Sequence, residues 1–451
     1  MDGTGILDNG EQRLADIVGP PSLSRAPAGP RDRRPDRLAT WVRGQLVSAR
    51  RHAMSHRPFR EGDYGGGAAA PKLANLEAVN ALLAIARKRE AEALNRLKDR
   101  TGRALARPDR ARLGAFLRAK ALSHARTRSA ERIWLFYNNL FEQRGGPFAD
   151  MLLAMDRIAV DCYQACYMGL GAARSIPTPP PFAYVEAGYG PATYRRGVRL
   201  TKLGKSANPF PLVKLPHHRL VNPWALGAVP HEVGHNIQND VKLWAELPRL
   251  ITRRLTEAGL PPQAILVWAR WHKEIYADLI GVLLIGPSYV ASLMDVVGKT
   301  PARVARFDPR GAHPTSLLRP LISIELVRRI GFPREADELT RAWSALYPPS
   351  VATRVPRFLK DSFPKANRLT VDTICFQPHP SYGNRPLAGV TRFRQQDGET
   401  VREAAERLAA GTDPGILPER FFIPAVREAL SRGLAPPDRL ADNFYKALTR
   451  R

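Results

Sequence analysis

Two histidines and a glutamate lie within five residues of one another near the middle of the chain. His231, Glu232 and His235 form the pattern H-E-x-x-H in the segment HEVGH. On a helix, residues i and i+4 lie on one face, so both imidazoles can bind one metal ion. Glu232 can then reach a water on that metal and accept its proton. The pattern therefore predicts a zinc site (Zn2+) that hydrolyses a bond.

A catalytic zinc site needs a third protein ligand, and a second motif supplies a candidate. Glu274 and Asp278 are four residues apart in the otherwise apolar segment WHKEIYADLIGVLLI. Acidic side chains are rarely buried unless they are paired or bound to a metal. Glu274 is thus the predicted third ligand, and Asp278 is predicted to accept the free ring N–H of a ligand histidine. The alternative is that both acids belong to a solvent-exposed stripe of the helix.

The two motifs together resemble the gluzincin zinc metallopeptidases, in which H-E-x-x-H is followed by E-x-x-x-D on a second helix. The segment EIYAD is similar to the E-x-x-A-D of the HtpX and CAAX-prenyl-protease family, and HPTSLLR has that family's downstream H-P-x-x-x-x-R pattern. The resemblance covers about residues 180–335. It implies a metallopeptidase in which His313 hydrogen-bonds the transition-state oxyanion and Arg319 lies nearby. Members of that family usually span membranes, so this chain looks like a soluble relative.

The residues around the motifs predict how they are positioned. Residues 182–219 alternate in polarity and contain many β-formers, which predicts three short strands before the zinc helix. Residues 211–220 are the predicted edge strand, with Pro216 suited to an edge, where extended substrate would pair. The predicted fold class is α+β and mostly α, with a zincin-like catalytic domain. Its small antiparallel or mixed sheet precedes the zinc helix and is flanked by helical segments.

Changes in composition divide the chain into four expected regions. A disordered basic tail is expected over residues 1–75 and a helical N-terminal region over 76–175. The zincin-like catalytic domain is expected over 176–347. An irregular segment followed by C-terminal helices completes the chain over 348–451. We also expect the tail to contain one short helix after Asp36 and to be dispensable for folding.

The charge of the chain favours an anionic partner. Its 451 residues contain 69 Lys and Arg against 42 Asp and Glu, a net charge of +27. The basic tail suggests an anionic partner, either nucleic acid or an acidic protein, in addition to a peptide or protein substrate. The alternative is that the excess of arginine reflects an arginine-rich genome. This charge also supports an alternative function, a nucleic-acid-binding protein with a vestigial or structural zinc site. Glu232 argues against that alternative, because a structural site needs no general base.

Several classes of protein are disfavoured by the sequence. A hydrophobic content of 44% with 25% charged residues excludes a wholly disordered chain. The three cysteines cannot form a disulfide framework, and the N-terminal residues do not resemble a secretory signal. The longest apolar stretch, residues 279–294, is too short for a membrane span and is interrupted by Pro287. These features predict a cytoplasmic protein without a membrane span.

Overall fold

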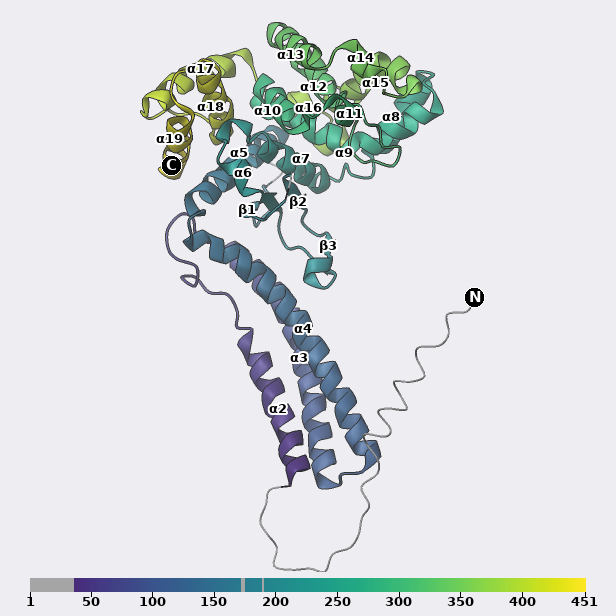
Figure 1. Cartoon of the computed structure of the whole chain (residues 1–451), viewed down its shortest axis with the longest axis vertical. Helices are drawn as coiled ribbons and strands as arrows, with labels where there is room; N and C mark the ends of the chain where they lie inside the picture. Colours follow the sequence, from purple (N-terminus) through teal and green to yellow (C-terminus); the bar gives the residue numbers. More distant parts are fainter. Residues whose placement is uncertain (1–35, 172–174, 189) are drawn as a thin grey trace, which may run out of the picture.

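The molecule consists of an arm of long helices and a larger helical body (Figure 1). The computed structural model describes residues 36–171, 175–188 and 190–451. The arm contains the helices α2 (Arg37–Ser55), α3 (Leu73–Ala106) and α4 (Arg110–Glu142). At about 1.5 Å per residue, the 34 residues of α3 span about 50 Å.

Apolar residues spaced three and four apart hold the arm together. In α3 the buried positions include Leu76, Val79, Leu83 and Ala86, and this spacing forms one apolar stripe along the helix. Buried residues of α4 form the facing stripe at the body end, where Tyr137 donates a hydrogen bond to Asn208 of the body (2.9 Å). The base of the arm therefore shares a hydrophobic core with the body.

Residues 36–75 are folded in the structure, whereas the sequence analysis expected a mostly disordered tail over residues 1–75. The expected short helix is present as α2. After it, Phe59 and Tyr64 are buried, and the Tyr64 hydroxyl donates to Asn138 on α4 (2.8 Å). These two aromatic residues anchor the segment on the arm. Its Arg, Gly and Pro content concealed them. The first 35 residues lie outside the described part of the chain.

A small mixed sheet lies between the arm and the helices of the body (Figure 1). Its spatial order is β1 (Phe182–Val185), β5 (Leu212–Leu215) and β2 (Ala192–Tyr194). Strand β5 pairs parallel with β1 and antiparallel with β2. The expectation of a small sheet before the helices is confirmed. A separate two-stranded sheet joins β3 (Arg199–Leu200) and β4 (Ser206–Ala207).

The predicted edge strand is wrong, because β5 lies in the centre of the sheet and β2 lies at its edge. Strand β5 ends before Pro216, and the next residues form the short helix α6 (His217–Leu220). The error arises because β5 pairs with β1, which lies about 30 residues earlier in the chain. No local sequence pattern reveals a pairing between strands that far apart. Strands β2 and β5 both lie against α7.

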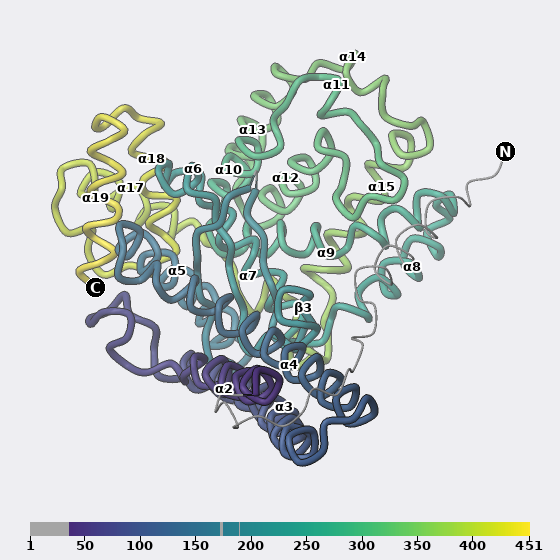
Figure 2. The backbone as a smooth tube through the Cα atoms, turned by 60° about the horizontal axis from the view of Figure 1, so that its bottom comes forward, coloured from purple at the N-terminus to yellow at the C-terminus, as the bar shows by residue number. Residues whose placement is uncertain are grey.

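Helices form most of the body, and α7 and α9 are central to it. Figure 2 shows α7 between α5 and α9. Residues 274–285 of α9 are all buried, so this helix forms the middle of the core. The remaining α-helices and the short 3-10 helices have the following bounds: α5 (Ala149–Leu170), α7 (Ala228–Asp240), α8 (Leu247–Glu257), α9 (Pro262–Ile285), α10 (Pro287–Val297), α11 (Pro301–Val304), α12 (Arg319–Arg329), α13 (Pro333–Leu346), α14 (Pro349–Ala352), α15 (Arg357–Cys375), α16 (Leu387–Val390), α17 (Gln395–Ala410), α18 (Phe422–Ser431), α19 (Pro437–Thr449), η1 (Gln143–Gly145), η2 (Thr201–Leu203), η3 (Pro223–Ala225), η4 (Pro380–Tyr382) and η5 (Glu419–Phe421).

The segment expected to be irregular after residue 347 contains a 19-residue helix, α15. Its buried residues include Leu359, Ser362, Ala366 and Thr370, which follow helical spacing. Pro364 lies inside this helix and concealed it, because proline usually ends a helix. Among the described residues, no helix has the length and apolar character that a membrane span requires.

Candidate metal centre

Helices α7 and α9 cross closely because small residues face each other there. A Cβ atom placed on Gly234 would lie 2.9 Å from the Cα atom of Ala277 and 3.4 Å from its Cβ atom. Any larger side chain at Gly234 would therefore push the helices apart. Gly234 belongs to HEVGH and Ala277 to EIYAD. The same two motifs thus supply both the polar side chains and the small residues that bring them together.

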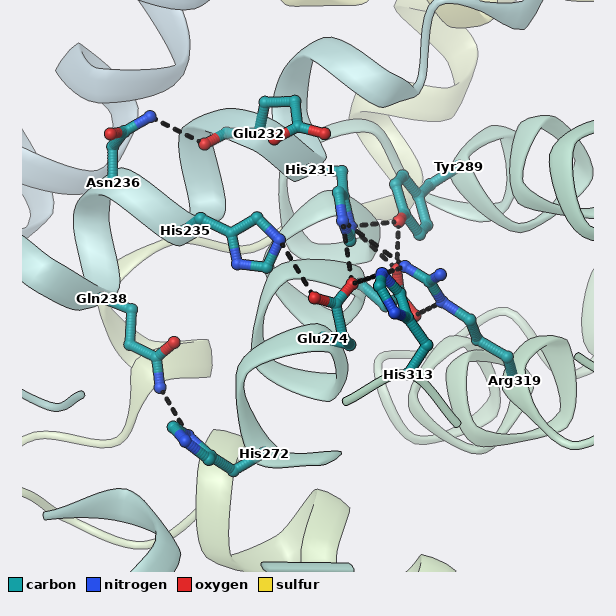
Figure 3. Close-up of polar contacts among 11 residues, drawn as sticks. His231, Glu232, His235, Asn236, Gln238, His272, Glu274, Tyr289, His313 and Arg319 are labelled. Atoms are coloured by element: carbon teal, nitrogen blue, oxygen red, sulfur yellow. Dashed lines mark hydrogen bonds and ion pairs between the residues drawn. The ribbon is translucent and has the colours of Figure 1, made fainter. Parts of the chain in front are cut away.

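The side chains of His231, His235 and Glu274 converge where the two helices cross (Figure 3). Nε2 of His231 lies 3.5 Å from Oε2 of Glu274, and Nε2 of His235 lies 3.7 Å from Oε1. Both distances are too long for good hydrogen bonds. Two ligands of a tetrahedral zinc, each about 2.1 Å from the metal, lie about 3.4 Å apart. This group could therefore hold a metal ion, and two imidazoles with one carboxylate are donors that zinc accepts.

Asp278 fixes the orientation of the His231 ring. Oδ1 of Asp278 lies 2.9 Å from Nδ1 of His231, so the other ring nitrogen, Nε2, faces Glu274. The Tyr289 hydroxyl donates to the same carboxylate oxygen (2.5 Å). Arg319 donates to Asp278 through Nε (2.6 Å) and Nη2 (2.8 Å). Asp278 thus contacts three side chains from α7, α10 and α12.

A glycine on α9 allows Tyr289 to reach Asp278. A Cβ atom on Gly281 would lie 2.2 Å from the Tyr289 ring, so the ring lies directly against the helix backbone. Sequence reasoning missed Tyr289. Its only signal was a tyrosine in a long apolar segment, since a buried tyrosine hydroxyl usually requires a hydrogen-bond partner.

The electrostatics of the group favour an anionic Glu274 between the two histidines. Burial alone would raise the pKa of Glu274, but His231, His235 and Arg319 outweigh it and hold the pKa well below its usual range. Burial would lower the pKa of His231, yet the carboxylates of Asp278 and Glu274 beside its two ring nitrogens raise it to about 9. Burial and the charge of His231 lower the pKa of His235 to about 3. His235 is therefore the neutral imidazole that a metal requires.

Glu232 lies on the other side of His231 and lines the same cavity. Only 5% of Glu232 is exposed, and burial raises the pKa of its carboxyl to about 7. The cavity has a volume of about 680 Å³ and is also lined by His231, His235 and Glu274. Its wall includes Ala192 and Thr193 of the edge strand β2. Asn236 on α7 donates to the Thr193 hydroxyl (2.7 Å), which ties the strand to the helix.

The structure also brings the two residues of the downstream motif to this group. Nε2 of His313 lies 3.2 Å from Oε2 of Glu274, and the His313 side chain is 67% exposed at the cavity rim. Nη2 of Arg319 lies 3.4 Å from the same oxygen, and Arg319 is buried. The two acids, Glu274 and Asp278, are 5% and 1% exposed, so they do not belong to a solvent-exposed stripe. All seven predicted site residues therefore lie in one cluster.

Other polar residues near the cluster have different environments. His272 on α9 hydrogen-bonds Gln238 (3.1 Å), and burial lowers its pKa to about 4 (Figure 3). Nδ1 of His235 is buried without a hydrogen-bond partner in the described part of the chain. Trp244 lies beside His235, with ring centroids 6.4 Å apart. Sequence reasoning missed Trp244, because it lies in the turn after α7 and belongs to no motif.

Comparison of the chain with models of known protein families, with curated proteins and with solved structures found no match. The candidate metal group and the mostly helical α+β fold therefore rest on the residues and their geometry alone.

Proposed function

We propose that this protein is a zinc-dependent peptidase that uses Glu232 as its general base. The observation that carries the proposal is the convergence of His231, His235 and Glu274 in one cavity that Glu232 also lines. A structural zinc site generally has four protein ligands and needs no general base. Here the three ligands border an accessible cavity, which is the arrangement that a catalytic site requires.

The residues of the cluster suit hydrolysis of an amide bond. A zinc ion held by His231, His235 and Glu274 would act as a Lewis acid and lower the pKa of a water to about 7. The carboxylate of Glu232 would accept a proton from that water. Its acid form would then donate that proton to the leaving amine.

Arg319 and His313 have separate parts in this proposal. Arg319 is a positioning residue, because it binds Asp278 through two nitrogen atoms and Asp278 in turn orients His231. His313 is exposed at the rim and close to Glu274, so its ring can reach a substrate oxygen above the metal group. A hydrogen bond there would stabilise the negative charge that develops on the carbonyl oxygen.

Strand β2 is suited to hold an extended substrate over the cluster. It pairs on one side with β5, and its other side lies at the cavity wall. Backbone hydrogen bonds to such an edge would bind a peptide with little dependence on its sequence, and pockets along the cavity would add specificity.

A casein digest tests the proposal. We expect the protein to cleave casein into new peptides identified by mass spectrometry, to stop after dialysis against a chelator, and to resume when zinc is added. Undiminished cleavage by the metal-free protein would contradict a zinc-dependent mechanism.

A second candidate function is nucleic-acid binding, and the helical arm is the feature that favours it. Residues 37–142 contain 22 Lys and Arg against nine Asp and Glu. Phosphate neutralisation is the usual use of such a surface. The arm extends away from the body, so this candidate and the peptidase are compatible within one molecule (Figure 1).

A further inference from the structure

The cavity over the metal group has two chemically different ends. At the His231 end, Tyr289 and the apolar residues Leu293, Val296 and Val297 of α10 line the wall. At the His235 end, Trp244 stands beside the histidine ring. A substrate lying across the group would therefore meet mainly apolar residues of α10, with Ser292 and Lys299 beside them, on one side and Trp244 on the other.

Two cationic side chains converge on Trp244 at the second end. The guanidinium carbon of Arg195, which directly follows β2, lies 3.4 Å from the centroid of the Trp244 ring. Nζ of Lys273 on α9 lies 5.7 Å from the same ring. All three side chains line the cavity and are partly exposed. Residues from three separate elements thus place two positive charges around one aromatic ring.

These two cations have capacity for a ligand. Within the described residues, neither Arg195 nor Lys273 forms an ion pair with a carboxylate. Arg195 donates one hydrogen bond to Asn239 (3.1 Å), which leaves most of its five N–H donors for other partners. Asp240 lies near Arg195 and offsets part of its charge, but the two side chains form no ion pair.

The rest of the cavity wall does not neutralise this positive charge. Its acidic residues are Glu232 and Glu274, and both belong to the metal cluster. Glu274 is held by its contacts with the two ligand histidines. The positive charges of Arg195 and Lys273 are therefore available to an anionic group of a ligand in the cavity.

We propose that Arg195, Lys273 and Trp244 form a subsite for a substrate carboxylate close to the bond that is cleaved. The proposal rests on the peptidase function and gives it a substrate class. Arg195 would bind the carboxylate through paired N–H donors, and Lys273 would add a second charge-assisted hydrogen bond. The ring of Trp244 lies 6.4 Å from that of His235, which places the subsite close to the metal group.

Two sources of carboxylate fit this chemistry, an Asp or Glu side chain and the C-terminus of a peptide. Matched peptides distinguish them. One set carries Glu or Gln at each of the three positions on either side of a bond located in the casein digest. The other set ends in a free carboxylate or an amide. We expect a preference in one of these two sets. In that set, the zinc-loaded protein should cleave the peptide with the carboxylate with a kcat/KM about tenfold higher than that of its neutral counterpart.

Two variants connect that preference with the subsite. Lys273→Glu should abolish it, because the new carboxylate would pair with Arg195 and leave no net positive charge at Trp244. Arg195→Gln should reduce the ratio to near one. Lys98→Glu makes the same charge change on an exposed residue of the arm and should retain the wild-type ratio. Because Lys273 adjoins Glu274, the zinc content of each variant is measured on the same sample.

An equilibrium measurement separates binding from turnover. The Kd of Glu and Gln peptides for the Glu232→Gln protein should differ in the same direction as kcat/KM. Equal Kd and equal kcat/KM for every carboxylate and neutral pair would overturn the subsite and leave the peptidase proposal standing. If the zinc-loaded wild-type protein cleaves no peptide at all, the peptidase proposal fails and the subsite proposal fails with it.

Discussion

Replacement of Asp278 by Asn should destabilise the protein and weaken its metal site. Asp278 is 1% exposed and accepts hydrogen bonds from Tyr289 and from two nitrogen atoms of Arg319. Asn keeps nearly the same shape but removes the negative charge. The buried guanidinium of Arg319 would then lose its main partner, and Glu274 at 3.4 Å would compensate only in part.

The magnitude follows from the burial of the pair. Breaking a buried ion pair by removing one partner costs about 3–5 kcal/mol in the free energy of unfolding. His231 would also lose the carboxylate that orients its ring, and the loss of such a partner weakens metal affinity about 10–100-fold. The first effect is measured by urea unfolding of metal-free protein. The second is measured by zinc titration against a competing chelator.

A double-mutant cycle tests the stated cause. Arg319→Met alone should be destabilising because it leaves the Asp278 charge without its cation. The double variant Asp278→Asn/Arg319→Met should lose less than the sum of the two single losses, because it removes both charges. Additive losses, or a loss below about 1 kcal/mol for Asp278→Asn with unchanged zinc affinity, would refute this account of the network.

Three further predictions concern the helix crossing, the arm and its charge. Gly234→Ala should lower the free energy of unfolding by about 1–3 kcal/mol and weaken zinc binding, because its Cβ would collide with Ala277. The control Gly102→Ala, on the exposed side of α3, should be neutral or stabilising by up to about 1 kcal/mol. Equal zinc affinities of the Gly234→Ala and wild-type proteins would contradict the crossing argument. Deletion of residues 1–75 should lower the melting temperature, contrary to the expectation from sequence, because it removes α2 and the buried Phe59 and Tyr64; an unchanged melting curve would refute this. Full-length protein should bind duplex DNA with an affinity that falls steeply between 50 and 200 mM salt, as about six or more phosphate contacts would require; binding that is insensitive to salt would exclude the arm's charge as its cause.

The metal group is the part of the structure that the sequence predicted best. HEVGH and EIYAD each place their polar residues one helical turn apart, so each motif determines one face of a helix without reference to the rest of the chain. A zinc site needs a third ligand and buried acids need partners, so the residues of the two motifs were predicted to lie together. Gly234 and Ala277 were present within the same motifs, although only the structure shows that they form the crossing point.

Features that depend on distant pairing were not predictable in this way. The order β1-β5-β2 is set by contacts between strands far apart in sequence, so the edge strand was assigned incorrectly. Tyr289 and Trp244 reach the site from a separate helix and a turn, and neither belongs to a motif. Pro364 concealed α15, since the packing of its buried face outweighs the local cost of proline.

Zinc content and peptide turnover of the Glu232→Gln protein, measured on one sample beside wild type, test the central claim most directly. The substitution leaves His231, His235 and Glu274 in place and removes only the proposed base. We predict one zinc ion per chain in both proteins and a turnover about 10²–10⁴-fold lower in the variant. Unchanged turnover by the zinc-loaded variant, or full zinc content in a protein that carries both His231→Ala and His235→Ala, would contradict the account.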